Sequence, residues 1–164
     1  MQYSSDNVIN MAFVGHSGSG KTVLCDTILF NSKAIRSIGA IDKGTTVSDY
    51  RAEEIQHQHS VSLTPTYYEF LDKKINIIDS PGMLDFQGEM ICSLNAADMA
   101  TFVVNSVNGL EIGAEVALDY CSGDYQKPKS IIVNMIDRDQ SDFNKVLKQL
   151  KQRFGREVFP FMLP

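Results

Sequence analysis

The sequence predicts a three-layer α/β fold, in which a mostly parallel sheet of six strands carries helices on both faces. Short β-rich runs alternate with helical patterns along the 164 residues. The runs INII at 75–78 and SIIVN at 130–134 are almost continuously apolar. Strands have this composition when helices cover both faces of the sheet. A chain of this length is expected to form a single domain.

The β-rich runs place the expected strands at 8–14, 66–71, 74–79, 100–105, 130–134 and 157–163. One helix is expected near 111–122, where apolar residues recur at helical spacing. Another follows Asp137, with Asp139 or Ser141 able to cap its start and Gly155 able to end it. Its apolar face consists of Phe143, Val146, Leu147, Leu150 and Phe154.

Composition limits the classes of partner. Fifteen basic and twenty acidic residues give a net charge of −5, so a phosphate-rich partner must be held by a local site, and no sequence-specific nucleic-acid binding is predicted. Three widely spaced cysteines indicate reduced thiols. No segment approaches the ~20 apolar residues of a membrane span. We therefore expect a cytoplasmic protein with no membrane partner.

A phosphate-binding loop is predicted directly after the first strand. The stretch GHSGSGKT at 15–22 fits the pattern GxxxxGK followed by Ser or Thr, with a strand before it and a helix after it. In such loops backbone N–H groups and the helix N-terminus surround phosphate oxygens, Lys21 reaches the β and γ phosphates, and Thr22 offers its hydroxyl to Mg²⁺. The alternative is a Gly/Ser-rich turn with an incidental lysine. The predicted nucleotide contacts here are Gly15, His16, Ser17, Gly18, Ser19, Gly20, Lys21 and Thr22.

Other parts of a nucleotide site are expected at the carboxyl ends of neighbouring strands. Asp79 ends the run INIID and is placed to hold Mg²⁺ through water; otherwise it is an ordinary aspartate at the end of a strand. Asn134 and Asp137 end the run SIIVNMID, where a carboxylate can accept the N1 and N2 protons of guanine. The polar stretch 32–65 has no strong period, and connections of that length are usually functional or mobile. It is therefore a candidate switch region.

The stretches GHSGSGKT, DSPG and NMID stand in the order and approximate spacing of the phosphate, magnesium and base motifs of Ras-like GTPases. Around them, GTTVSDYRAEE, KINIIDSPGMLDF and RFGREVFPFMLP resemble the N-terminal GTP-binding domain of translation elongation factor G, most closely its divergent elongation factor G-like group. The resemblance implies a C-terminally truncated P-loop NTPase fold of the Ras-like type. It also implies a larger protein that binds the ribosome with GTP and promotes translocation.

The resemblance divides residues 1–164 of this single domain into functional parts. These are a phosphate loop at 15–22, a first switch at about 32–65, a second switch at 79–96 and a base motif at 134–137. It assigns phosphate contacts to Lys21 and its loop, γ-phosphate sensing to Gly82, and base selection to Asn134 and Asp137, with Met135 between them as a further nucleotide contact. It assigns Mg²⁺ to Thr22, Ser60 and, through water, Asp79.

The chain departs from the family's pattern at three places. Met83 replaces the usual water-orienting histidine, and a thioether donates nothing and does not titrate. Hydrolysis is then expected to be impaired, unless His16 or a ribosomal phosphate orders the water. Met135 replaces a lysine. Methionine keeps the apolar stem of that side chain but not its charge. The stretch HQHS at 57–60 replaces Arg-Gly-Ile-Thr, and we interpret it as a mobile switch rather than a metal pair.

The leading hypothesis is therefore a Mg²⁺-dependent GTP/GDP-binding domain of an elongation factor G-like translation factor, with Lys21, Gly82 and the degenerate Met83 at the reacting centre. A second hypothesis is a ribosome-binding module that binds GTP without useful turnover. A phosphate-loop ATPase or small-molecule kinase is the third, disfavoured because adenine has no donor pair for Asp137. The chain ends at Pro164, before the Ser-Ala loop and closing helix that the family implies, so the resemblance predicts a fragment.

Overall fold

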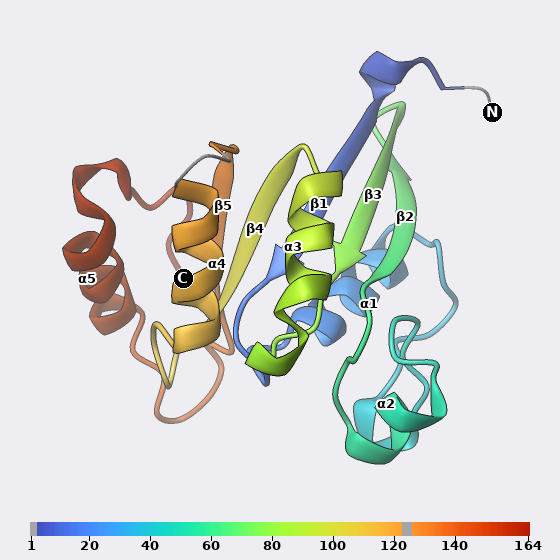
Figure 1. Ribbon diagram of the computed structural model, residues 1–164, viewed down its shortest axis with the longest axis horizontal. Helices are drawn as coiled ribbons and strands as arrows, with labels where there is room; N and C mark the ends of the chain where they lie inside the picture. The colour runs from blue at the N-terminus through green and yellow to red at the C-terminus, as the bar shows by residue number, and fades with distance from the viewer. Residues whose placement is uncertain (1–2, 123–125) are drawn as a thin grey trace.

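In the computed structural model, which describes residues 3–122 and 126–164, strands and helices alternate as the sequence predicts. The strands form one sheet in the order β2-β3-β1-β4-β5 (Figure 1). Neighbours are parallel, except that β2 is antiparallel to β3. The carboxyl ends of the four parallel strands therefore lie at one edge. The bounds are β1 Val8–Val14, β2 Thr64–Phe70, β3 Lys73–Asp79, β4 Met99–Asn105 and β5 Lys129–Asn134.

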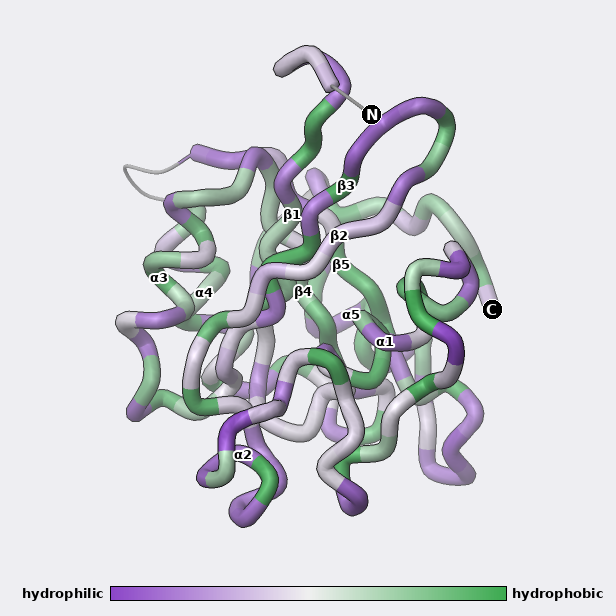
Figure 2. Tube along the Cα trace, turned by 90° about the vertical axis from the view of Figure 1, so that its right-hand side faces the viewer, coloured by the Kyte–Doolittle hydropathy of each residue, from purple (hydrophilic) through white to green (hydrophobic). Residues whose placement is uncertain are grey.

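Helices cover both faces of the sheet, which confirms the three-layer prediction. Helix α1 (Lys21–Asn31) packs on one face, while α3 (Gln87–Ala96), α4 (Ile112–Ser122) and α5 (Phe143–Phe154) pack against other parts of the core (Figure 1). The short α2 (Ala52–His57) lies off the carboxyl ends of the strands instead. Figure 2 shows that α2 is largely hydrophilic, whereas β4 and β5 in the interior are largely hydrophobic.

The two layers of core follow from the period of two in β1. Ala12 and Val14 are fully buried against α3 and α4, whereas Phe13, between them, is buried with Cys25 and Leu29 of α1. Burial raises the pKa of the Cys25 thiol to about 12, so this cysteine behaves as a small apolar core residue. The packing anchors α1 directly behind the end of β1, where the glycine-rich loop begins.

Helix α5 has the predicted apolar face but a different cap. Val146 and Leu150 are buried, and Gly155 is the C-cap as predicted. The N-cap is Asp142, whose carboxylate accepts the backbone N–H of Lys145 at 2.8 Å. The prediction of Asp139 or Ser141 as the cap was wrong, because the loop carries the chain further before the helix starts. The hydroxyl of Ser141 instead donates to the carbonyl of Ile136.

The predicted sixth strand at 157–163 is absent from the described residues, and the sheet has five strands rather than six. A 3-10 turn at Gly155–Glu157 follows α5, and the chain is irregular beyond it. Pro160 has no N–H with which to join a ladder. The apolar residues that suggested a strand are 72–90% exposed, namely Phe159, Phe161, Met162 and Leu163. Within the described residues, no helix is both long and apolar enough to cross a membrane.

Candidate functional site

The loop at 15–22 depends on glycine for its path. Gly15, Gly18 and Gly20 have φ values of 147°, 76° and 90°, a region that disfavours residues with a Cβ. A Cβ on Gly15 would also strike the carbonyl oxygen of Val103 in β4. Helix α1 begins at Lys21 with no side-chain cap from Gly20. The N–H groups of its first turn therefore have no intrahelical partner and point into the loop.

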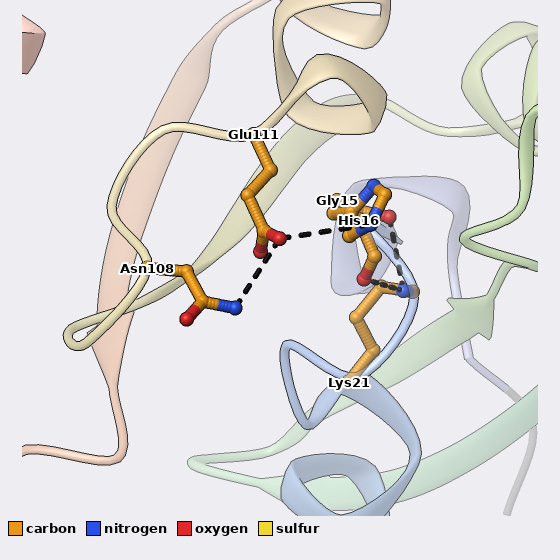
Figure 3. Close-up of polar contacts among 5 residues, drawn as sticks. All are labelled: Gly15, His16, Lys21, Asn108 and Glu111. Atoms are coloured by element: carbon orange, nitrogen blue, oxygen red, sulfur yellow. Dashed lines mark hydrogen bonds and ion pairs between the residues drawn. The ribbon is translucent and has the colours of Figure 1, made fainter.

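Lys21 turns back into the loop that precedes it. Its ammonium donates to the carbonyl oxygens of Gly15 at 3.0 Å and His16 at 2.9 Å (Figure 3). The residue is only 6% exposed, and burial lowers the pKa of its ammonium, although the charge of Asp79 acts in the opposite direction. The loop thus holds one buried cation surrounded by backbone.

Three predicted magnesium residues meet beside this cation, although they come from three separate segments. The Thr22 hydroxyl donates to Oδ2 of Asp79, the last residue of β3, at 2.7 Å. Oγ of Ser60, from the 32–65 segment, lies 3.4 Å from the same hydroxyl. The structure thus brings Thr22, Asp79 and Ser60 together, although Ser60 was expected here only from the family resemblance.

Asp49 belongs to the same cluster, and the sequence reading missed it. Its carboxylate accepts the Ser60 hydroxyl at 2.7 Å, and the residue is 4% exposed. Burial raises the pKa of Asp49 even though the hydrogen bond from Ser60 lowers it. In the sequence, Asp49 is an aspartate within a polar stretch, a pattern that ordinarily indicates a solvated loop and does not point to a buried carboxylate.

The donor set suits a magnesium ion that is shared with phosphates. Two hydroxyls and two carboxylates supply hard oxygen ligands, and Oδ1 of Asp79 is buried without a hydrogen-bond partner among the described residues. Burial raises the pKa of Asp79 to about 6, partly offset by Lys21. A cation would relieve the cost of burying these charges. The described part of the chain holds no group of three or more His, Cys, Asp or Glu side chains able to bind a metal.

Gly82 lies against the loop, and Met83 follows it. The Gly82 carbonyl accepts the N–H of Ser17 at 3.1 Å. A Cβ at Gly82 would come within 2.5 Å of both the Ser17 nitrogen and the Lys21 ammonium, so only glycine allows this approach. Met83 has an ordinary extended backbone (φ −83°, ψ 142°) and is half-buried.

The side chain of His16 lies beside the loop before α4. Its Nε2 lies 3.6 Å from Oε1 of Glu111, which also accepts the side-chain amide of Asn108 at 3.2 Å (Figure 3). Gly113 in the first turn of α4 allows the close approach, because a Cβ there would lie 3.0 Å from the Cα of His16. The loop before α4 therefore braces the outer side of the glycine-rich loop.

The 134–137 motif is joined to the glycine-rich loop from the other side. The side-chain amide of Asn134 donates to the carbonyl of Ser19 at 2.9 Å. Met135 has a left-handed backbone (φ 61°), and its carbonyl accepts the hydroxyl of Ser106 at 2.7 Å. Asp137 is exposed. The structure thus brings Asn134 and Met135 to the loop and leaves Asp137 facing solvent.

Comparison with known proteins shows the family of the chain. The family described as elongation factor Tu GTP binding domain matches residues 6–162. The chain belongs to this family. An elongation factor G-like protein from Mycobacterium tuberculosis is 33% identical over 157 residues, which are 96% of this chain and 22% of that protein. The mitochondrial ribosome-releasing factor 2 of Drosophila willistoni is 33% identical over 159 residues, 96% of this chain and 21% of that protein.

A solved structure confirms the fold of this GTP-binding domain. A crystal structure of a Thermus thermophilus protein superposes with a TM-score of 0.86 at 31% identity, covering 90% of this chain and 22% of that one. The resemblance to elongation factor G-like GTP-binding domains is thereby confirmed. The chain spans about a fifth of the length of these relatives.

In this GTP-binding domain, two buried carboxylates organise the segment 32–65, and the sequence reading missed both. Asp26 of α1 is fully buried and accepts the N–H groups of Gly39 at 3.0 Å and Val47 at 3.2 Å. Glu54 of α2 is 1% exposed and accepts three backbone N–H groups, those of Arg51, Val61 and Ser62. Buried carboxylates therefore supply hydrogen-bond acceptors for backbone N–H groups of a segment that has little regular secondary structure.

The stretch 57–60 ends α2 with a strained turn. Gln58 has a left-handed backbone (φ 56°), at the position where the family resemblance places glycine, and the ring of His59 lies 5.7 Å from that of His57. Nδ1 of His59 is 2.9 Å from the carbonyl of His57. The two histidines thus contact each other and the local backbone. Ser60 follows the turn, and its hydroxyl lies near that of Thr22.

Proposed function

We propose that this chain binds GTP and GDP with Mg²⁺ as the GTP-binding domain of an elongation factor G-like translation factor. The observation that carries the proposal is the position of the Thr22 hydroxyl, within hydrogen-bond distance of both Asp79 and Ser60. It lies at the start of the helix that follows a glycine-rich loop, where phosphates bind in this fold.

Each of these residues has a role in the proposed site. Backbone N–H groups of 15–22 and the Lys21 ammonium bind the β and γ phosphates. The buried hydroxyl of Ser19, which has no hydrogen-bond partner among the described residues, belongs to the same loop. Thr22 and Ser60 offer hydroxyls to Mg²⁺, and Asp79 acts through water. When bound, Mg²⁺ neutralises charge on the phosphates.

Guanine selection is assigned to the exposed end of the 134–137 motif. Asp137 accepts the N1 and N2 protons of the base, while Asn134 ties the motif to Ser19. Met135 packs its stem beside the base, without the charge of a lysine. An adenine ring offers Asp137 no matching pair of donors.

Turnover is proposed to be slow. Gly82 senses the γ-phosphate through its backbone, and Met83 supplies neither a donor nor a titrating group for the attacking water. His16 is held toward Glu111, which disfavours it as a substitute. A module that binds GTP without useful turnover is the second candidate, favoured by the same methionine.

The ribosome is the proposed partner of the whole protein, in the cytoplasm. Elongation factor names among the relatives and the ribosome-releasing factor support this assignment. The net charge of −5 argues against binding of this domain through a general basic surface, so its own contact is expected through the switch segments at 32–65 and 79–96.

Nucleotide choice is tested by competition for labelled GDP bound to the 164-residue chain. We expect unlabelled GTP to displace it, and ATP to fail even at roughly 10³-fold excess, because Asp137 rejects adenine. An Asp137→Asn variant should bind GDP about tenfold more weakly, the cost of one charge-assisted hydrogen bond. Asp139→Asn, at an exposed carboxylate two residues away, is the matched control and should bind normally. Effective displacement by ATP would remove the guanine assignment and favour an ATPase or kinase.

A further inference from the structure

Residues 60–63 are held by carboxylates from two parts of the fold, the 32–65 segment itself and helix α3. Asp49 accepts the Ser60 hydroxyl, and Glu54 accepts the N–H groups of Val61 and Ser62. Both acids belong to the same 32–65 segment. The next residue, Leu63, donates its N–H at 2.8 Å to Oε2 of Glu89, which lies in α3. The position of the segment therefore depends on a helix outside it.

Two contacts dock Leu63 on α3. The bond to Glu89 is short and charge-assisted, so it is stronger than an ordinary backbone hydrogen bond. The Leu63 side chain is half-buried against the core cluster that contains Met90 and Leu94 of the same helix. Glu89 also lies in the first turn of α3, where the helix dipole stabilises a negative charge. Ser60 precedes Leu63 by three residues, at most ~10 Å of extended chain, so the anchoring of Leu63 on α3 limits the positions open to the Ser60 hydroxyl.

Helix α3 is in turn connected to the glycine-rich loop through Gly82. The chain runs from Gly82 through Met83 and the turn Leu84–Phe86 directly into α3. The Gly82 carbonyl accepts the N–H of Ser17. The same helix thus has one end at the proposed γ-phosphate contact and a side chain on the segment that follows Ser60.

We propose that Glu89 is a positioning residue that couples α3 to the Ser60 hydroxyl, so that the γ-phosphate contact at Gly82 and the Mg²⁺ contact at Ser60 form together. The inference rests on the proposed function. In GTPases the γ-phosphate and Mg²⁺ order both switch segments. Coupling between two contacts is reciprocal, so the tie favours a nucleoside triphosphate over a diphosphate at the same site.

The test compares Glu89→Ala and Glu89→Gln with the unsubstituted 164-residue chain. Affinities for a slowly hydrolysed GTP analogue and for GDP are measured at saturating Mg²⁺, and the Mg²⁺ dependence of analogue binding is titrated. We expect Glu89→Ala to lower the affinity for the GTP analogue about five- to tenfold, within the usual range of coupling between sites. The affinity for GDP should not change. Glu89→Gln should recover most of the loss, because its amide oxygen still accepts the Leu63 N–H.

Glu53→Ala is the matched control, since Glu53 is an exposed glutamate in the same 32–65 segment and should change neither affinity. If Glu89→Ala lowers the affinities for the analogue and for GDP equally, the proposal is overturned. It is also overturned if Glu89→Gln loses as much affinity for the analogue as Glu89→Ala does. If the unsubstituted chain binds neither nucleotide, the proposed function fails and the coupling fails with it. Selective loss of the analogue in Glu89→Ala alone supports the coupling.

Discussion

A Met83→His variant should hydrolyse bound GTP about 10² times faster than the unsubstituted chain, the lower end of the range for one positioned acid–base group. The backbone at Met83 is extended, a conformation that histidine adopts without backbone strain, and the side chain is half-buried. It would stand next to Gly82, whose carbonyl holds Ser17 of the glycine-rich loop. Unlike a thioether, imidazole can accept and donate a hydrogen bond to an attacking water. Single-turnover hydrolysis, with and without ribosomes, measures the rate.

Met83→Leu is the control for this substitution, because it keeps an apolar side chain of similar volume. Its turnover should match that of the unsubstituted chain, while GDP affinity stays the same in all three proteins. Rapid hydrolysis by the unsubstituted chain would contradict the proposed role of Met83. Equal rates for Met83→His and Met83→Leu would support a module that binds GTP without useful turnover.

A Lys21→Met variant should lose nucleotide affinity by on the order of 10³-fold, as expected when one partner of a buried charge pair is removed. The ammonium of Lys21 is the cation that the structure places inside the loop at 15–22. Methionine keeps the apolar stem and its volume but removes the charge. Titration with a fluorescent GDP analogue, measured side by side for the two proteins, gives the ratio of the dissociation constants.

The same variant should still fold without nucleotide, which a melting curve checks. The desolvation cost of the buried ammonium, seen in its lowered pKa, offsets the loss of its hydrogen bonds to Gly15 and His16 and of its attraction to Asp79. Lys148→Ala, at an exposed lysine of α5 far along the chain, is the control and should bind GDP normally. A Lys21→Met protein that melts normally and retains GDP affinity would contradict the phosphate role of Lys21.

Much of the architecture was predictable, because the apolar runs in the sequence coincide with the strands that the folded protein buries. The apolar runs became β1, β3, β4 and β5, and the glycine-rich loop lies between the first strand and α1 as the motif requires. The strand at 157–163 failed for a physical reason. Its apolar composition resembled a strand, but Pro160 interrupts the N–H ladder and its large side chains are exposed.

The contacts within the site were less predictable than its members. The motif and the strand end placed Thr22 and Asp79 at the same edge of the sheet, whereas Ser60 was expected there only from the family resemblance. Asp26, Asp49 and Glu54 carry no such signal, because a buried acid and a solvated acid look alike in sequence. Only the structure reveals their roles, through the hydrogen bonds that they accept from backbone N–H groups and from the Ser60 hydroxyl.

The most direct test of the proposed nucleotide site is a crystal structure of this chain with Mg²⁺ and a slowly hydrolysed GTP analogue. We predict the phosphates within the loop at 15–22 and Mg²⁺ on the hydroxyls of Thr22 and Ser60. We also expect a water between Mg²⁺ and Asp79, and the guanine edge on Asp137. A nucleotide bound with its phosphates away from Lys21, or with its base away from Asp137, would contradict the proposed site.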